Sequence, residues 1–397
     1  MKRTILLFSL LLMITPAALV SQEAPAAELY LLTCGPGTET YSIYGHSALR
    51  VVIPEKNSDM VYNWGVFDFA TSNFAWKFAK GRLKYSLGVT SYDRFLKEYY
   101  LEQRWVVSQK LNLHGNEIQK VFDLIVENLK PENVSYKYDF FYDNCSTRIR
   151  DLIEKALGEV LVYPPDKPSG ELLTFRSLIG KYEKGYPWLQ FGTDLLIGSP
   201  ADKKASFRNA MFLPLELKDG LSECVVRREG KMIPLLTDPV LVVDFPTPAA
   251  KEKLLASPLF VLSLLLIAMI IITGTIRARK ANDIIDLILY SVFSVLALIM
   301  VFFNFFADHI ETRWNLNIIW LSPFLFICLI NLILKKYRSL WFRVVFFMTT
   351  AFLAFIVILP QDINNAFVPL IIIIMLRSSI RAGFAWNPLT LPYLTQL

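Results

Sequence analysis

Residues 138–151 read YDFFYDNCSTRIRD, and one of only four cysteines in the 397-residue chain lies at their centre. After an aromatic and acidic run, apolar residues recur at a helical spacing that stops at Gly158. We therefore predict a helix that begins at Cys145, with Asp143 or Asn144 as its N-cap. A cysteine in this position is either a buried thiol that fills space or a nucleophile held at a helix N-terminus.

The predicted position of Cys145 favours a reactive thiol. The positive end of a helix dipole lowers the pKa of a thiol, and the backbone N–H groups there can bind a developing oxyanion. A thiolate nucleophile also needs a histidine within hydrogen-bond reach. Of the three histidines, His114 lies in a predicted turn, HGNE, and His309 follows a predicted membrane span. His46, which follows Gly45 in SIYGHSALRVVI, is therefore the candidate base, although a lone strand histidine can also be a satisfied interior residue.

A third polar group is expected to orient the imidazole of His46. Residues 41–53 and 60–69 are predicted to form two strands joined by the turn between them. The residue opposite His46 in such a hairpin falls between Asn63 and Asp68, depending on the register. We favour Asn63 and keep Asp68 as the alternative.

The other three cysteines are weaker candidates for a nucleophile. Cys34, in TCGPGTE, precedes His46 by twelve residues and is the rival, but its Gly-Pro-Gly turn supplies no helix dipole. Cys34 and Cys224 are both expected outside the cytoplasm, so they could form a disulfide. Cys328 lies inside a predicted membrane span, where packing is its expected role.

The second half of the chain is predicted to lie in a membrane. Hydrophobic residues make up 54% of the sequence and the mean hydropathy is +0.39, more than a soluble chain normally carries. The excess lies after residue 256, in apolar runs close to the length that crosses a bilayer. The five expected spans are 258–276, 284–306, 317–334, 341–359 and a shorter one at 367–379.

Charge predicts the orientation of these spans. From residue 257 onward the chain has ten Lys and Arg against five Asp and Glu. Basic residues follow the first, third and fifth spans, whereas the other two connections, ADHIETRWNL and PQDINN, carry one basic residue between them. By the positive-inside rule, the basic connections are cytoplasmic and the region before residue 257 lies on the opposite side.

The N-terminus has the layout of a secretory signal peptide. Lys2 and Arg3 precede an apolar run, and small residues follow it. Cleavage is expected at 18–24, with an uncleaved anchor as the alternative. The predicted organisation is a signal peptide at 1–22, a periplasmic catalytic domain at 23–256 and a transmembrane helical domain at 257–397. In a Gram-negative host, this is a multi-pass protein of the inner membrane.

The region before the spans is predicted to be an α+β domain. Residues 116–129 have helical spacing, 136–141 are typical of a short strand, and the Pro- and Gly-rich stretch 163–220 is expected to be irregular. The charge of this region is close to neutral, which argues against nucleic acid as a partner. No residues have the spacing of a metal site, so no metal or other cofactor is expected.

Two segments combine aromatic and charged residues in a way that suits a membrane surface. FAWKFAKGRLKYSLGV (74–89) includes Trp76 and Arg82, and ADHIETRWNLN (307–317) includes His309 and Arg313. Aromatic rings prefer the headgroup level and cations bind lipid phosphates. Each segment could equally be an ordinary amphipathic helix or a solvated loop. We take these four residues, with Asn144 beside the thiol, as candidates for substrate binding.

Several blocks of the sequence resemble one known family. They are CGPGTETYSIYGHSALRV, YNWGVFDF, YDFFYDNCSTRIRD, PWLQFGTDLLIGSPAD, MFLPLEL and FFADHIETRWNLNIIWLSP. A histidine on a first strand, about a hundred residues before an Asn-Cys pair that opens a helix, is similar to the permuted papain-like group, which includes the lecithin:retinol acyltransferase relatives. The blocks and the membrane half together resemble the Lnb family of lipoprotein N-acyltransferases.

The resemblance implies a membrane-bound acyltransferase with a permuted papain-like domain. Its implied substrates are a phospholipid, as acyl donor, and lipoproteins whose N-terminal diacylglyceryl-cysteine accepts the chain on its α-amine. The thiol of Cys145 would carry the chain as a thioester. Two other interpretations stay open: a membrane-anchored cysteine hydrolase acting on peptidoglycan or peptide, which would need only one anchor, and a non-catalytic envelope binding or assembly protein.

Overall fold

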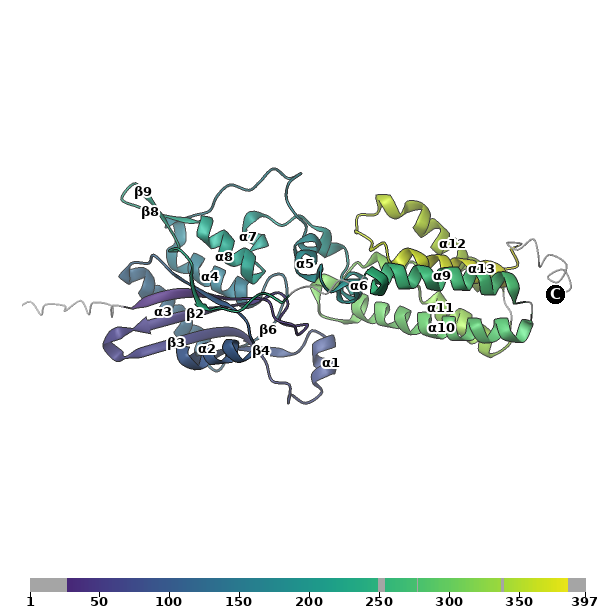
Figure 1. The fold of residues 1–397 in the computed structure, drawn as a ribbon, viewed down its shortest axis with the longest axis horizontal. Coiled ribbons are helices and arrows are strands. Elements are labelled where there is room, and N and C mark those ends of the chain that lie inside the picture. Colours follow the sequence, from purple (N-terminus) through teal and green to yellow (C-terminus); the bar gives the residue numbers. More distant parts are fainter. Residues whose placement is uncertain (1–26, 249–253, 277, 337–338, 385–397) are drawn as a thin grey trace, which may run out of the picture.

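The computed structural model describes residues 27–248, 254–276, 278–336 and 339–384. The expected signal peptide at 1–22 lies outside these ranges. Figure 1 shows a domain built around a β-sheet, followed along the long axis of the molecule by a bundle of helices. This confirms the predicted order of an α+β domain before an all-α membrane region.

The core of the first domain is an antiparallel sheet of seven strands, in the order β10–β5–β1–β2–β3–β4–β6. The predicted hairpin is present, because β2 pairs with β3 and Leu49 lies opposite Tyr62. The strands are β1 (Glu28–Cys34), β2 (His46–Ile53), β3 (Ser58–Val66), β4 (Lys84–Ser91), β5 (Val106–Lys110), β6 (Ser135–Lys137) and β10 (Val240–Val243). A smaller sheet joins β7 (Leu161–Val162), β8 (Val225–Arg228) and β9 (Lys231–Pro234).

Helices cover both faces of the large sheet (Figure 1). Successive side chains on a strand point to opposite faces, and on β1 Leu31 packs into one apolar cluster while Leu32 packs into another. The Leu31 cluster includes α3 (Gly115–Leu129), α4 (Cys145–Leu157) and α8 (Pro214–Glu223); the Leu32 cluster includes α2 (Tyr92–Leu101). The helix that begins at Cys145 therefore packs on the sheet that carries His46.

Two predicted strands are shorter than expected. The first begins at His46, because residues 38–44 form turns and Gly45 has a φ of +80°, which interrupts the extended backbone. The strand expected at 136–141 ends at Lys137. The carboxylate of Asp139 accepts hydrogen bonds from the N–H groups of Phe141 and Tyr142, and this turn takes the chain out of the sheet.

The prediction of irregular structure at 163–220 was wrong. This stretch contains α5 (Phe175–Glu183), α6 (Pro187–Leu196), α7 (Phe207–Ala210) and α8. Pro187 and Pro214 occupy the first helical positions of α6 and α8, where a missing N–H costs nothing and the fixed φ suits the helix. Two of the prolines whose abundance predicted irregular structure therefore start helices.

The membrane region consists of α9 (Pro258–Thr275), α10 (Arg279–Val301), α11 (Phe324–Ile333), α12 (Ser339–Phe355) and α13 (Phe367–Arg381). Among the described residues, three helical stretches are long and apolar enough to cross a membrane: Pro258–Thr275, Arg279–Phe306 and Ser339–Ile358. These correspond to the first, second and fourth predicted spans. The helices at the third and fifth positions have 10 and 15 residues, fewer than the roughly 20 that span a bilayer.

The third span is short because its predicted first half is not part of the helix. Asn317 is fully buried, and its side chain bonds the carbonyl oxygen of Asp194 at 3.2 Å and the indole N–H of Trp320 at 2.9 Å. Pro323 then precedes α11. The connection 307–323 thus extends further into the apolar run than hydropathy indicated, because its polar groups bind the soluble domain.

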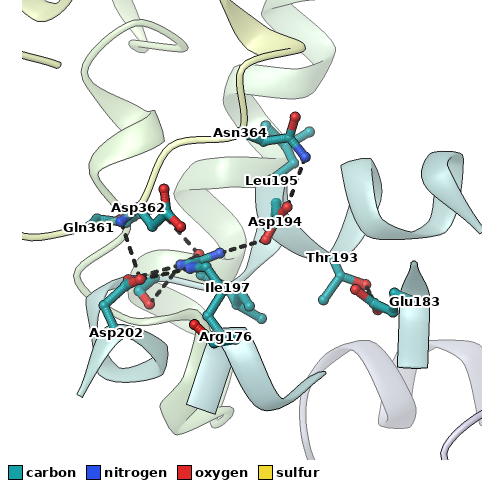
Figure 2. Close-up of polar contacts among 12 residues, drawn as sticks. Arg176, Glu183, Thr193, Asp194, Leu195, Ile197, Asp202, Gln361, Asp362 and Asn364 are labelled. Carbon is teal, nitrogen blue, oxygen red and sulfur yellow. Dashed lines mark hydrogen bonds and ion pairs between the residues drawn. The ribbon is translucent and has the colours of Figure 1, made fainter. Parts of the chain in front are cut away.

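A buried polar network around Arg176 joins the two parts of the chain (Figure 2). Arg176, on α5, donates to Asp194 at 2.9 Å and to Asp202 at 2.8 Å, and all three side chains are at most 10% exposed. Asp194, on α6, also accepts from Asn364 at 2.8 Å, and Asp202 accepts from the N–H of Asp362 at 3.2 Å. The network therefore fixes the soluble domain to the connection between α12 and α13.

Further contacts join the end of α6 to the connection between α10 and α11. The N–H of Gly198 donates to the carbonyl of Glu311 at 2.7 Å, and the amide of Asn315 donates to the carbonyl of Leu195 at 2.8 Å. A Cβ atom at Gly198 would lie 2.0 Å from the carbonyl oxygen of Arg313, so only glycine permits this approach. Both connections that charge predicted on the side of the soluble domain thus contact it.

We expect Arg176→Met to destabilise the full-length protein strongly. The substitution leaves Asp194 and Asp202 buried without their cation, and breaking a buried ion pair from one side costs about 3–5 kcal/mol. Thermal unfolding of the detergent-purified chain should show a clear drop in midpoint temperature. Lys181→Met is the matched control on the same helix, because its pair with Glu216 is partly exposed and such pairs contribute about 0–1 kcal/mol. Equal effects of the two substitutions would contradict the role given to the network.

Candidate active site

The helix α4 begins at Cys145 because the preceding residue caps it. The side-chain oxygen of Asn144 accepts hydrogen bonds from the N–H groups of Ser146 at 2.8 Å and Thr147 at 3.0 Å. The hydroxyl of Thr147 in turn accepts from the N–H of Asn144 at 2.7 Å, so the two residues form a reciprocal cap. The thiol is therefore held at the N-terminus of a 13-residue helix, where the dipole favours negative charge.

The amide nitrogen of Asn144 is also fully used. It donates to the carbonyl oxygens of Phe140 at 2.7 Å and Phe212 at 2.9 Å. With two bonds accepted and two donated, the side-chain amide has no hydrogen-bonding capacity left for a ligand. The expectation that Asn144 binds substrate is therefore corrected: it lines the cavity, but its side chain positions the nucleophile.

His46 lies at the first position of β2. A Cβ atom at Gly45 would lie 2.7 Å from the carbonyl oxygen of Cys34, so a glycine is needed for the chain to turn into the strand here. On the neighbouring strand, the side-chain oxygen of Asn63 is hydrogen-bonded to Nε2 of His46. Asp68, the alternative partner, lies exposed beyond the end of β3, and its carboxylate accepts from the N–H of Ala70 at 2.8 Å.

Cys145 and His46 lie close enough to shift each other's pKa, and both line the same cavity. Burial by itself raises the pKa of the Cys145 thiol, but the imidazole of His46, with the Ser47 N–H and the Ser146 hydroxyl, outweighs burial and lowers that pKa below its ordinary value. Burial by itself lowers the pKa of His46, but the charge and hydrogen bond of Cys145, with Asn63, outweigh it and raise that pKa. Both shifts favour a thiolate beside an imidazolium.

The rival cysteines have no such environment. Cys34 and Cys224 are fully buried free thiols, and burial raises the pKa of each to about 12. The two pack in different apolar clusters on opposite faces of the sheet, so the disulfide considered from the sequence is not formed. Cys328 is a free thiol buried in α11, consistent with the packing role expected for it.

The thiol and the imidazole open into a cavity of about 560 Å³, a volume within the range of small-molecule sites. Its walls are mainly apolar and aromatic, and several come from α5 and α6 at the junction with the membrane region. They include Phe67, Phe69, Phe74, Phe78, Leu83, Tyr85, Tyr138, Phe140, Ile179, Leu189, Ile197, Phe212 and Leu213. Within the described ranges, no three or more His, Cys, Asp and Glu side chains gather in a way that could hold a metal ion.

Of the remaining residues predicted to bind substrate, one lines the cavity and three do not. His309 lines it, with a ring nitrogen 2.9 Å from the carbonyl oxygen of Phe78. Arg82 pairs with Asp308 at 2.8 Å, just outside the lining residues. Trp76 on α1 (Phe74–Ala79) is 60% exposed and packs on Phe302. Arg313 is exposed and does not line the cavity, because the backbone at this point is held against the soluble domain.

Three residues near the thiol were not identified from the sequence. Tyr138 and Phe140 line the cavity, and the buried carboxylate of Glu311 accepts from the N–H of Phe140 at 2.9 Å. Burial, followed by the charge of Asp139, raises the pKa of Glu311. The aromatic run directly before Cys145 was a signal for the first two. The link to Glu311 joins segments 171 residues apart, and no local pattern indicates it.

Two family models match this chain. The one described as the Lnb N-terminal periplasmic domain matches residues 16–179, and the one described as the Lnb transmembrane domain matches residues 250–385. Together they cover most of the sequence, in the same order as the two parts of the fold. Comparisons with curated proteins and with solved structures returned no match.

The lowered pKa of Cys145 beside His46 predicts how this thiol reacts with iodoacetamide. Because the pKa of Cys145 is lowered, alkylation should persist below the pH range of an ordinary thiol and should be lost as the pH falls through that lowered pKa. In His46→Ala, the largest contribution that opposes burial is lost, the pKa rises, and alkylation at pH 7 should slow by about tenfold for each pKa unit. Peptide mass spectrometry of the labelled protein measures both effects.

The same measurement has an internal control. Cys34 and Cys224, with pKa values raised to about 12 by burial, should remain unlabelled at pH 7 in the folded protein. An unchanged pH profile for Cys145 in His46→Ala would mean that the imidazole does not activate the thiol.

Proposed function

The chain belongs to the Lnb family, and from that premise we propose that it is a lipoprotein N-acyltransferase. It moves an acyl chain from a phospholipid, through a thioester on Cys145, to the α-amine of the diacylglyceryl-cysteine of lipoproteins. One observation carries the proposal: the Cys145–His46 pair opens into an aromatic and apolar cavity at the junction with the membrane helices. An acyl chain is the ligand that such walls favour.

The position of the cavity suits substrates that are held in a membrane. The family matches make this a membrane protein with a periplasmic N-terminal domain. We place it in the inner membrane, with 1–22 as the export signal, 23–256 as the catalytic domain and 257–397 as the multi-pass anchor. Phospholipids and lipoproteins in the outer leaflet of that membrane would then meet the cavity where the two parts of the chain join.

In the first half-reaction, the thiolate of Cys145 attacks the carbonyl carbon of a phospholipid ester. The new C–S bond forms as the carbonyl electrons move to oxygen, and collapse of this intermediate breaks the ester C–O bond. The imidazolium of His46 gives its proton to the departing lysophospholipid oxygen. The products are a thioester on Cys145, a neutral imidazole and a lysophospholipid.

In the second half-reaction, the α-amine of the lipoprotein attacks the thioester. The C–N bond forms, the C–S bond breaks, and His46 takes the proton that the amine loses. The thiolate–imidazolium pair is then restored. Asn63 holds one ring nitrogen, Nε2, and so keeps the imidazole oriented toward the thiol through both steps.

The alternative of a cysteine hydrolase uses the same pair but a different ligand. A peptide or a glycan needs polar groups along its site, because each of its own donors and acceptors must be paired when it loses water. Tyr44 and Thr193 line the cavity, yet both of their hydroxyls already donate to Glu183, at 2.7 and 2.6 Å. The lining therefore favours a hydrocarbon chain over a peptide or a glycan.

The test is to express the protein in cells that lack their own lipoprotein N-acylation. Mass spectra of lipoprotein N-terminal peptides should show N-acylation with the wild type and none with Cys145→Ala or His46→Ala. Cys34→Ala should retain it, because that thiol is buried and protonated. N-acylation that survives in Cys145→Ala would overturn the assignment of the nucleophile.

The two alternatives have their own results in this test. Release of free fatty acid or cleaved peptide, without N-acylation, would indicate a hydrolase. A wild-type chain that reaches the membrane folded but produces no new product would indicate a binding or assembly protein.

The purified enzyme should have a bell-shaped dependence of kcat/KM on pH when lysophospholipid release is measured. The acid limb follows Cys145: activity is lost as the pH falls through its lowered thiol pKa. The alkaline limb follows His46: the imidazolium that protonates the leaving group is lost as the pH rises through its raised pKa. Asn63→Ala should move the alkaline limb to lower pH, because it removes one of the bonds that raise the His46 pKa. An alkaline limb that stays in place would contradict the orienting role of Asn63.

A further inference from the structure

Both half-reactions of the proposed transfer pass through a tetrahedral intermediate with a negatively charged oxygen. Enzymes stabilise such an oxyanion with hydrogen-bond donors that are already in place, and each donor is worth a large factor in rate. The donors must lie beside the nucleophile and must be free of protein acceptors. The described residues around Cys145 include a backbone group and a cavity-lining side chain that meet both conditions.

The backbone group is the N–H of Cys145. The next two N–H groups of α4, those of Ser146 and Thr147, donate to the side chain of Asn144, and the N–H of Arg148 donates to the Asn144 carbonyl. The N–H of Cys145 donates to no protein acceptor in the part of the chain that the structure describes. Asn144 thus satisfies the other donors of the first turn and leaves free the one nearest the thiol.

The side chain is Tyr138. It lines the cavity together with Cys145, and Gly65 shows how close the two are. A Cβ atom built on Gly65 would lie 3.7 Å from Cε2 of Tyr138 and 3.9 Å from Cβ of Cys145. Cε2 is bonded to the carbon that carries the hydroxyl. The hydroxyl end of the ring and the side chain of Cys145 therefore both lie next to Gly65. The ring packs on Tyr85, with centroids 4.5 Å apart, which restricts its movement.

The hydroxyl of Tyr138 is free to act as a donor. It has no hydrogen-bond partner among the described residues, although the ring is partly buried. Burial, followed by the charge of Cys145, raises the pKa of this phenol well above its ordinary value, so its proton stays in place. A hydroxyl in this state gains a strong, charge-assisted bond when an oxyanion forms beside it.

Other polar groups near the thiol are occupied. The side-chain amide of Asn144 makes all four of its bonds to the protein. The hydroxyl of Ser146 lies 3.2 Å from that of Ser47 and 3.9 Å from the sulfur of Cys145. His46 is committed to Cys145 and Asn63. The hydroxyl of Tyr136 is also buried without a partner, but Tyr136 does not line the cavity. Tyr138 is thus a cavity-lining side chain beside the thiol with an unused donor.

We propose that the Tyr138 hydroxyl and the Cys145 N–H together form the oxyanion-binding site of this enzyme. When the thiolate adds to the acyl carbonyl, the carbonyl electrons move to oxygen, and that oxygen accepts one bond from each group. Both bonds are released when the intermediate collapses to the thioester or the amide, and Tyr138 keeps its proton throughout. The inference rests on the proposed function, since it concerns the transition states of that transfer.

The test uses the purified full-length protein in mixed micelles of detergent and a phosphatidylethanolamine with one kind of acyl chain. Intact-protein mass spectrometry follows the acyl-enzyme, and lysophospholipid release gives kcat and KM. Tyr138→Phe removes only the hydroxyl and should lower kcat for acyl-enzyme formation by about 10²–10³-fold, the usual cost of one oxyanion donor. KM and the pH profile of Cys145 alkylation should stay close to wild type, because the ring and the thiol–imidazole pair remain.

Tyr142→Phe is the matched control, since Tyr142 lies in the same segment but does not line the cavity. It should acylate at the wild-type rate. Wild-type acylation by Tyr138→Phe would overturn the inference, and so would an equal loss of acylation and of Cys145 alkylation, which would indicate a structural role. A wild-type protein that never forms an acyl-enzyme would instead refute the proposed function, so the two failures are distinguishable.

Discussion

The four hydrogen bonds of the Asn144 side chain are the contacts on which the candidate site depends most. Two of them cap α4 and set the position of the Cys145 thiol at its first residue. The other two bind the carbonyl oxygens of Phe140 and Phe212, which belong to different segments of the cavity wall. One buried amide therefore places the Cys145 thiol, starts its helix and holds two wall segments against it. A residue with fewer donors and acceptors could not do all three.

The second constraint is the attachment of the soluble domain to the membrane region. Arg176 binds two acids that in turn contact the connection before α13, and Gly198 allows the backbone near Arg313 to approach closely. Glu311 extends this attachment to Phe140, five residues before the thiol. These contacts hold the connection between α10 and α11 against the soluble domain, and this connection supplies His309 to a cavity whose other lining residues come from the soluble domain.

Much of this arrangement was predictable from residue spacing. The start of α4 at Cys145, the hairpin of β2 and β3, and three of the five membrane spans agree with the sequence patterns. The errors have local causes. The Pro and Gly content of 163–220 predicted irregular structure, but two of its prolines start α6 and α8. The polar contacts of Asn317 shorten the third span. In each case a tertiary contact or a helix-start preference outweighed composition.

Spacing and composition along the chain were sufficient to place Cys145 at a helix start, to select His46 as its candidate partner and to divide the chain into a soluble and a membrane part. These features follow from periodicity, capping residues and hydropathy, which are local. Long-range packing alone selects Asn63 over Asp68 beside His46 and brings Tyr138 to the thiol. It also places the cavity at the junction, because strand register and contacts between distant segments depend on how the whole chain packs.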